Sequence, residues 1–531
     1  MGSLTFLDTT LRDGAIAEEV NLSVGDKLHL APLIDSLGPT YIEGGWPLVN
    51  PNDEQFFRHA AELNLGAKLV AFGATRRPQT RVDVDPGMQA LLRCESPVVQ
   101  LYGKVWPLHV ESVLRTTLDE NLRMLTESIS FLKAQGKEVL IIAEHFYDAL
   151  EANRDYALTF AREAVSSGSD ILTLGDSNGR TLPPAVAEGT RLAIEIAGKI
   201  PVGFHLHNDC GLALANAVAA LDAGATHAQG SVNGYGARSG ITDLTSLLPI
   251  IKLIMHKDIV TDEQLARLTH VARTVAEWLG LGDEIRDRPF VGTRVFAHKT
   301  ETHVAAVMNN PEAYEAVPPS TVGNQRRLII PGVGRPAYLA RIAEQYGLDL
   351  REETAANRAI LKELRRLESE GYSFDDAPAS LEWRLGVLSG RFTPVLNVER
   401  LRLFETLRAR EVPTSEAALR FAGPDGAEYA AAEGDSPVDA LMGVICQALE
   451  RLGDESRTTF ARRLKLRSLR GRTLNDDPDP LRLRVSLTLS DGERDWTTVG
   501  LSRDFIQAVW QAMLDGIEYG LATRPVDAAA P

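Results

Sequence analysis

"VGFHLHND" (Val202–Asp209) is an apolar run that carries two histidines one residue apart. Its composition is typical of a buried strand, and side chains at positions i and i+2 of a strand point to the same face. His205 and His207 are therefore expected to lie side by side. They form either a packed pair of rings or two ligands of a metal site that needs a third ligand.

The same strand pattern recurs through the first half of the chain. Eight β-rich runs alternate with helical patterns at intervals of roughly 30 residues, which indicates βα units and a parallel sheet. Over about 250 residues, such units fit a closed (β/α)8 TIM barrel. The alternative is an open doubly wound sheet, but no glycine-rich fingerprint follows the first run. The runs are LTFLD (Leu4–Asp8), YIEGGWP (Tyr41–Pro47), KLVAFGAT (Lys68–Thr75), VVQLYGKV (Val98–Val105), EVLIIAEH (Glu138–His145), DILTLGDS (Asp170–Ser177), VGFHLHND (Val202–Asp209) and HAQGSVNGYG (His227–Gly236).

The chain of 531 residues is too long for a single core, so several domains are expected. We predict an α/β barrel, the catalytic domain, over residues 1–260 and helical linker subdomains over 261–390. The pattern then changes to strands and amphipathic helices, which predicts a separate α+β domain over 391–523. Residues 524–531 are expected to form a disordered tail.

The composition excludes several classes of partner. Asp and Glu outnumber Lys and Arg by 72 to 56, and the net charge of -16 disfavours a nucleic-acid partner. Cys94, Cys210 and Cys446 lie far apart, with no zinc-site or disulfide spacing, which favours the reducing cytoplasm. No apolar run approaches the roughly 18 residues that a membrane span requires, and we find no signal peptide, so no membrane partner is expected.

A candidate third metal ligand follows the first strand. In "DTTLRDG" (Asp8–Gly14), Asp13 offers a carboxylate and Arg12 a fixed cation. Active sites of such barrels lie at the carboxyl ends of the strands, where Asp13, His205 and His207 would form a site with open metal positions. A 2-oxo acid chelates such a metal through two oxygens. Arg12 would then stabilise the alkoxide that forms at the keto carbon.

Other polar residues near these strand ends have two interpretations. A His-x-His pair by itself is as typical of a core or loop as of a metal site. With Asp13 placed across the barrel, a metal site becomes the favoured interpretation. Asn233, in "SVNGYGARSG", binds the metal or its water, or it is a turn residue in a glycine-rich loop. Asp176 and Ser177, at the end of the sixth strand, are expected to bind and orient the substrate rather than to react.

Longer motifs resemble the acyl-CoA-condensing metallo-barrels, namely the isopropylmalate, homocitrate and citramalate synthases, which are relatives of the HMG-CoA lyases. The resemblance rests on "LDTTLRDG", "AEHFYDALEANRDYAL", "LGDSNGRTLP", "GFHLHNDCGLALANAVAALDAGA" and "GSVNGYGARSG". The citramalate synthase branch is closest in "YIEGGWPLVNPNDEQFF" and "FAHKTETHVAAVMNNPEAYEAV". The C-terminal "YAAAEGDSPVDAL" and "DWTTVGLSRDFIQAVWQAMLDGIEY" resemble the dimerisation and feedback domain of these synthases.

This resemblance implies a reaction and a set of residue roles. Acetyl-CoA would condense with a 2-oxo acid, pyruvate by default, in a metal-dependent Claisen-type reaction, and water would hydrolyse the thioester. The metal would be Zn, Mn, Mg or Co. The roles that carry over are metal binding by Asp13, His205, His207 and Asn233, and catalysis by Arg12, Glu144, His303 and Tyr314.

The resemblance also implies an assembly. The base, His303, comes from the partner subunit in this family, so a homodimer is expected, and an imidazole suits the task because its pKa lies near neutrality. Without the resemblance, His303 would be taken for a surface helix histidine and Tyr314 for a packing aromatic. The C-terminal domain would bind an amino-acid effector, isoleucine in the case of a citramalate synthase.

Several positions depart from the family pattern. Ala237 and Ile241 replace a Glu and an Asn in the loop after the eighth strand, and Thr300 and Glu301 replace two glycines. Because the metal set survives, catalysis is expected to survive, with a changed donor, acceptor or allosteric control as the alternative. Two other hypotheses remain, a lyase and a catalytically degenerate regulatory paralogue. The loop after the eighth strand lacks the cysteine of the lyases, and the retained site residues disfavour the paralogue.

Overall fold

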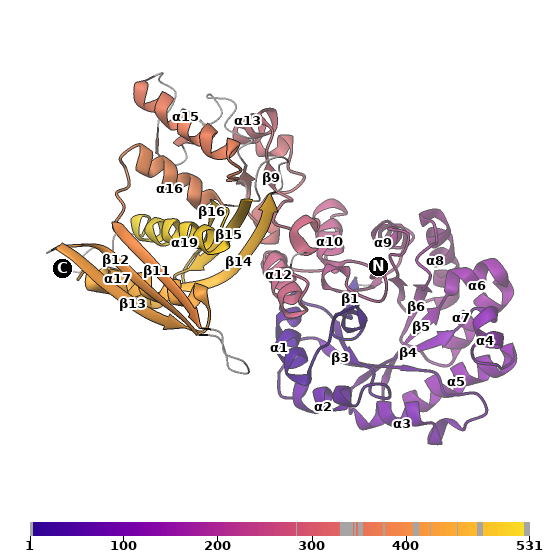
Figure 1. Cartoon of the computed structure of the whole chain (residues 1–531). Helices are drawn as coiled ribbons and strands as arrows, with labels where there is room; N and C mark the ends of the chain where they lie inside the picture. The colour runs from indigo at the N-terminus through magenta and orange to yellow at the C-terminus, as the bar shows by residue number, and fades with distance from the viewer. Residues whose placement is uncertain are drawn as a thin grey trace, which may run out of the picture. The chain divides into compact units, whose positions relative to one another are not determined.

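The computed structural model describes residues 4–282, 284–329, 343–344, 347–348, 354–374, 377–406, 414–424, 426–453, 455–474 and 482–524. Residues 525–531 of the predicted tail lie outside the described residues. The chain forms two compact units (Figure 1). The first comprises residues 1–297 and 306–327, and the second comprises residues 298–305 and 328–531.

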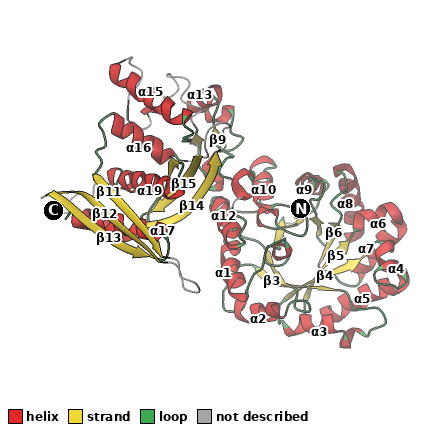
Figure 2. Cartoon of the chain, viewed as in Figure 1, coloured by secondary structure: helices red, strands yellow, loops and turns green. Residues whose placement is uncertain are grey.

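The first unit is built on a closed barrel of eight parallel strands within the described residues. Each strand pairs with its neighbour in sequence, and β8 closes the ring on β1, with Leu7 opposite Gln229. Figure 2 shows the strands in yellow with red helices around them. The predicted TIM barrel is confirmed, and the open sheet is not. The strands are β1 (Thr5–Asp8), β2 (Tyr41–Gly45), β3 (Lys68–Ala74), β4 (Val98–Lys104), β5 (Glu138–Glu144), β6 (Ile171–Asp176), β7 (Val202–Leu206) and β8 (His227–Gly230).

Helices follow the strands, and several begin at a residue whose side chain caps them. Ser23 accepts a hydrogen bond from the Asp26 N–H at the start of α1, and Asn153 accepts one from the Tyr156 N–H at the start of α7. Such caps satisfy N–H groups that the helix leaves unpaired. The helices of this unit are α1 (Val24–Asp35), α2 (Pro51–Ala60), α3 (Pro86–Arg93), α4 (Pro107–Ser112), α5 (Leu118–Ala134), α6 (Phe146–Ala152), α7 (Arg154–Ser166), α8 (Pro183–Ala197), α9 (Ala213–Asp222), α10 (Leu244–Pro249), α11 (Asp262–Leu265) and α12 (Leu268–Trp278).

The barrel interior changes from apolar to polar along the strands. Near their amino ends, a buried apolar cluster fills the centre, with Leu7, Val70 and Val98 among its members. At the next inward position, two residues further along β2 and β4, Gln100 donates a hydrogen bond to Glu43 (2.7 Å), and Gln229 donates one to Gln100 (2.6 Å). Buried polar groups are stable when they bond to one another, so this layer supports polar chemistry at the carboxyl ends.

The second unit contains a motif of three antiparallel strands and a helix, used twice. The first copy has β11 (Val398–Thr406), β12 (Thr414–Gly423), β13 (Gly426–Gly434) and α17 (Pro437–Arg451). The second has β14 (Lys465–Leu474), β15 (Arg482–Ser490), β16 (Asp495–Ser502) and α19 (Phe505–Ala522). One hydrophobic core includes strand residues such as Leu419 and helix residues such as Val444. These strands and helices confirm the expected α+β character.

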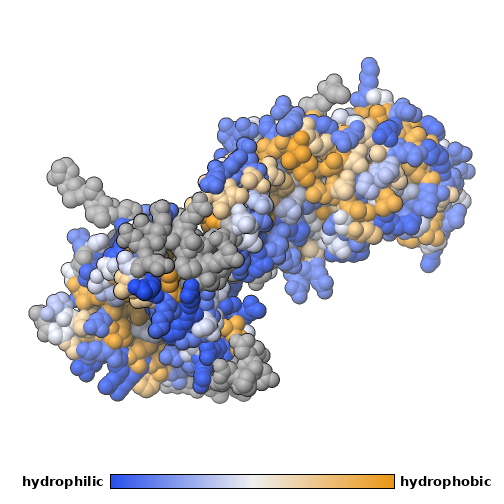
Figure 3. Space-filling model, turned by 90° about the horizontal axis from the view of Figure 1, so that it is seen from above, coloured by the Kyte–Doolittle hydropathy of each residue, from blue (hydrophilic) through white to orange (hydrophobic). Residues whose placement is uncertain are grey.

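The remaining elements connect these parts of the chain. They are β9 (Ala297–His298), α13 (Glu301–Asn309), β10 (Arg327–Leu328), α15 (Ala355–Ser369), α16 (Pro378–Leu388) and α18 (Glu455–Arg463). By packing, residues 261–297 join the barrel unit, and the assignment of 261–390 to linker subdomains stays a prediction. Hydrophilic and hydrophobic residues are mixed on the face in Figure 3. Within the described residues, no helix has the length and apolar character needed to cross a membrane.

Candidate active site at the carboxyl ends of the strands

The barrel brings together three side chains that are far apart in sequence. One ligand atom each of Asp13, His205 and His207 lies within 4.8 Å of the others, and all three residues are buried or nearly so. His205 Nε2 is 3.3 Å from Asp13 Oδ2, and the two imidazole rings are 5.4 Å apart between centroids. Among the described residues, these three form the one cluster of this kind. The structure thus provides the spatial arrangement that the metal hypothesis requires.

Unpartnered buried atoms indicate what this cluster is built to hold. Within the described residues, Asp13 Oδ1, His205 Nδ1, His207 Nδ1 and Asn233 Oδ1 are buried and have no hydrogen-bond partner. A buried polar group left without a partner is unfavourable by about 1–3 kcal/mol. A cation would satisfy carboxylate and imidazole atoms together, so the donor set fits a divalent metal.

The protonation states also suit metal binding. Burial raises the pKa of Asp13, but Arg12 and His205 outweigh it and hold that pKa below its ordinary value. Burial, together with the neighbouring His205, lowers the pKa of His207 to about 3. Near neutral pH, Asp13 is therefore a carboxylate and His207 a neutral imidazole, which are the forms that bind metals.

Asn233 has the backbone conformation of a turn residue, and a hydrogen bond holds its side-chain amide in one orientation. It lies in the short 3₁₀ turn η3 (Val232–Gly234) with φ +60°. Asparagine tolerates this region better than most residues. Its amide N–H donates to the carbonyl of Ala272 (2.8 Å), which fixes the side chain beside the barrel mouth. Both interpretations of Asn233 are therefore compatible with the fold, and its role as a ligand stays a prediction.

Arg12 is held in place by a residue that the sequence analysis did not single out. Arg12 Nε donates to Glu43 Oε2 (2.6 Å), and Arg12 Nη1 donates to Asp13 Oδ2 (3.0 Å). Its guanidinium carbon lies 3.9 Å from the centroid of the Phe72 ring. Glu43 is fully buried on β2. The sequence signal for Glu43 is an acidic residue within the otherwise uncharged run "YIEGG".

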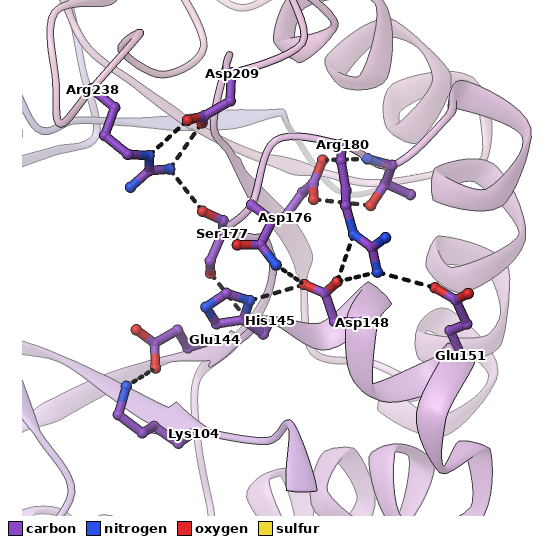
Figure 4. A network of polar contacts seen from close by, with 12 residues as sticks. Lys104, Glu144, His145, Asp148, Glu151, Asp176, Ser177, Arg180, Asp209 and Arg238 are labelled. Carbon is purple, nitrogen blue, oxygen red and sulfur yellow. Dashed lines mark hydrogen bonds and ion pairs between the residues drawn. The ribbon is translucent and has the colours of Figure 1, made fainter. Parts of the chain in front are cut away.

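The ends of β5 and β6 carry a second polar network (Figure 4). Glu144 Oε2 is 2.6 Å from Lys104 Nζ. The next residue, His145, has φ +61°, and its backbone N–H donates to Ser177 Oγ (3.0 Å). His145 Nδ1 is 2.9 Å from Asp148 Oδ2. Because Ser177 Oγ accepts from a backbone N–H, its hydroxyl proton is available to a ligand in the mouth.

Asp176 has a structural role in the loop after β6. It accepts hydrogen bonds from the Thr181 N–H (3.1 Å) and hydroxyl (2.9 Å). Burial raises the pKa of its carboxyl group. These contacts fit the expectation that Asp176 orients the site, and they place no reacting atom on it.

The two departures in the loop after β8 have a structural explanation. Ile241 is buried and forms an isolated antiparallel bridge with His207, so an apolar side chain fills that position. Arg238, beside Ala237, donates two hydrogen bonds to the Asp209 carboxylate (2.7 and 2.8 Å) and one to the Ser177 carbonyl (2.8 Å). Figure 4 shows Arg238 reaching Asp209 and Ser177. This loop is therefore ordered without the family's Glu and Asn.

The predicted base, His303, and the predicted catalytic tyrosine, Tyr314, belong to different units. His303 is half-buried on α13, which begins in the second unit, and Thr300 before it is exposed. Tyr314 is half exposed and belongs to the first unit, after the turn η6 (Pro311–Ala313). The side chain of Glu301 lies outside what the structure describes. The roles of His303 and Tyr314 stay predictions.

Comparison with known proteins places the chain in a family. The HMGL-like family model matches residues 3–275, and the model "Homocitrate synthase post-HMGL domain-like" matches residues 290–371. The (R)-citramalate synthase of Aquifex aeolicus is 37% identical over 97% of this chain and 97% of that protein. The (R)-citramalate synthase of Synechocystis sp. is 39% identical over 98% of this chain and 96% of that protein.

The chain belongs to the citramalate synthase family. This confirms the resemblance that the sequence motifs indicated. A 2-isopropylmalate synthase of Methanocaldococcus jannaschii is more distant, at 28% identity over 97% of this chain and 94% of that protein. As a member of the citramalate synthase family, the chain is an acyl-CoA-condensing transferase, as expected. Its barrel belongs to the metal-dependent HMGL-like family.

Proposed function

We propose that the chain condenses acetyl-CoA with pyruvate and hydrolyses the thioester, releasing citramalate and CoA. The observation that carries the proposal is the cluster of Asp13, His205 and His207 in a chain that matches curated (R)-citramalate synthases over nearly its full length. Neither the use of another 2-oxo acid nor a degenerate paralogue is favoured by these relatives. Acetyl-CoA as the donor follows from the same family membership.

A metal site follows from the donor set. Asp13, His205 and His207 would hold a divalent cation, with Asn233 beside it, and two imidazoles with one carboxylate suit Zn, Mn or Co better than Mg. When bound, the metal would polarise the keto group of the 2-oxo acid.

The chain's own residues would perform the remaining steps. Glu144 and His303 would act on the acetyl methyl group, with His303 removing the proton. Arg12 would stabilise negative charge on the keto oxygen, because Glu43 and Asp13 fix its guanidinium group in position. The Ser177 hydroxyl would donate to the carboxylate of the 2-oxo acid.

The aromatic side of the mouth supports a small acceptor. Trp46, Phe72 and Tyr102 pack against one another with centroid distances of 5.3–5.6 Å. Phe72 also contacts the Arg12 guanidinium group. Because large rings lie beside the group proposed to bind the keto oxygen, we expect pyruvate to fit better than a 2-oxo acid with a bulkier side chain.

Assembly and regulation complete the proposal. We propose a homodimer in which His303 comes from the partner subunit, and an amino-acid effector that binds the C-terminal α+β region. These points rest on family membership. A cytoplasmic location stays a prediction from the cysteine pattern.

The test is a substrate panel with metal control. The purified enzyme should release CoA from acetyl-CoA with pyruvate, lose activity to a chelator, and regain it with one of Zn, Mn, Co or Mg. D13N should lower the metal content, and it should lower kcat by at least about 100-fold. C210S, which changes an exposed residue near the mouth, should change neither. No CoA release with any 2-oxo acid and any metal would refute the proposal.

A further inference from the structure

Lys104 projects from a backbone position that is fixed on two sides. Its carbonyl accepts a hydrogen bond from Asn121 Nδ2 (2.7 Å), and Asn121 is buried and also donates to the Tyr156 hydroxyl (2.8 Å). Lys104 is the last residue of β4, where it pairs in register with Glu144 on β5. The position of Lys104 at the mouth is therefore set by the core of the barrel unit.

The side chain of Lys104 is directed at Glu144. Lys104 Nζ lies 2.6 Å from Glu144 Oε2, and only 16% and 25% of the two side chains are exposed. Lys104 Nζ also lies 5.6 Å from the centroid of the Tyr102 ring, two residues earlier on the same face of β4. In Figure 4 the pair lies beside His145, and the only bond drawn to Lys104 or Glu144 is the one that joins them. Because the pair is largely shielded from water, its geometry is better defined than that of a surface ion pair.

We propose that Lys104 is a positioning residue that holds the Glu144 carboxylate in one orientation towards the acetyl group. The inference rests on the proposed function, because Glu144 matters to the reaction only if the chain condenses acetyl-CoA. A carboxylate on a flexible side chain can point in many directions, and a neighbouring cation selects one of them. Lys104 thereby acts through Glu144 and touches no reacting atom.

The experiment is a double-mutant cycle on kcat, with wild-type activity towards pyruvate measured first. K104M should lower kcat at least about tenfold and change the KM for pyruvate little, since the described contacts of Lys104 are with Glu144, Tyr102 and Asn121 and not with the metal cluster. K104R keeps a cation and should recover a substantial part of kcat. In the E144Q background, K104M should cause no further loss, because its partner is already gone.

A control variant separates this effect from the loss of a lysine–glutamate ion pair elsewhere on the barrel; the Lys68 side chain of the control pair is more exposed, at 55%, than that of Lys104, at 16%. Lys68 Nζ is also 2.6 Å from a glutamate, Glu138 Oε2, but this pair lies at the amino ends of β3 and β5. K68M should leave kcat unchanged. Thermal unfolding and metal content of each variant identify any that fail to fold.

Each remaining outcome decides the proposal. Equal losses of kcat from K104M in the wild-type and E144Q backgrounds would overturn it, because Lys104 would then act independently of Glu144. An unchanged kcat in K104M would overturn it as well. If the wild-type enzyme released no CoA, the proposed function itself would fail, and that result is distinct from both.

Discussion

Glu43 shows how one buried residue can support a catalytic group without contacting a substrate. It accepts hydrogen bonds from Arg12 (2.6 Å) and Gln100 (2.7 Å) and is fully buried. It therefore balances the charge of Arg12 and fixes the guanidinium plane. The motif "DTTLRDG" indicates Arg12, whereas Glu43 has no comparable motif, because the role of this buried acid depends on a partner 31 residues away.

The variant E43Q tests this role. It keeps the shape of the side chain and removes its charge, so Arg12 should lose its fixed orientation, and kcat/KM should fall by about 10- to 100-fold. Metal content should stay stoichiometric, since Asp13, His205 and His207 are intact. A D35N control changes an acid that caps the Gly66 and Ala67 N–H groups and should leave kcat/KM unchanged. Loss of metal from E43Q would contradict the assignment.

His227 makes stability depend on pH. It is fully buried at the start of β8, and burial lowers its pKa from 6.5 to about 3. Between these values the unfolded chain binds a proton that the folded chain does not. Its contribution to stability is therefore present above about pH 6.5 and is lost as pH falls towards 3.

Urea unfolding of the wild type and H227Q across pH 4–7 measures this contribution. The free energy of unfolding of the wild type should fall more steeply with decreasing pH, by up to about 1.4 kcal/mol per pH unit. H59Q alters an exposed histidine on α2 and serves as the control. Equal slopes for the wild type and H227Q would exclude the buried histidine as the cause.

At the scale of elements, the ends of β2, β3 and β4 form one functional surface. Trp46, Phe72 and Tyr102 come from three successive strand ends and pack ring against ring. Each run was predicted as a strand, but the contact between the rings was not. A parallel barrel places residues about 30 apart in sequence side by side, and only the register determines which of them meet.

Removing one of these rings should change which 2-oxo acid the enzyme prefers. Y102A should raise the ratio of kcat/KM for a 2-oxo acid one or two carbons longer to that for pyruvate by at least about tenfold. Y102F keeps the ring and should behave like the wild type. The measurement is CoA release with a series of 2-oxo acids of increasing length. An unchanged ratio in Y102A would show that another element limits the acceptor.

At the scale of the whole molecule, the chain joins a barrel unit to a unit of two strand-and-helix repeats. His303 belongs to the second unit, whereas the metal cluster belongs to the first. If His303 of one subunit supplies the base for the site built around its partner's metal cluster, two differently inactivated chains should restore one complete site when they form a mixed dimer.

Mixing D13N with H303A tests this arrangement. Each variant alone should be nearly inactive, and the mixed sample should regain about a quarter of the wild-type activity, because half of the dimers are mixed and each has one complete site. D13N mixed with H207A should regain no activity, because both residues belong to the metal cluster of one subunit and every mixed dimer has two defective sites. A mixture of D13N and H303A with no regained activity would place His303 and Asp13 in the same subunit's site.

The sequence alone determined the alternation of strands and helices, and hence the barrel, because hydrophobic periodicity and the spacing of βα units are local properties. It also indicated Asp13, His205 and His207 as neighbours, since strand ends converge in a barrel. Only the tertiary structure decided that Glu43 holds Arg12, that Lys104 pairs with Glu144, and that Arg238 orders the loop that lacks the family's Glu and Asn. Those contacts depend on register and side-chain direction across strands, which no single stretch of sequence encodes.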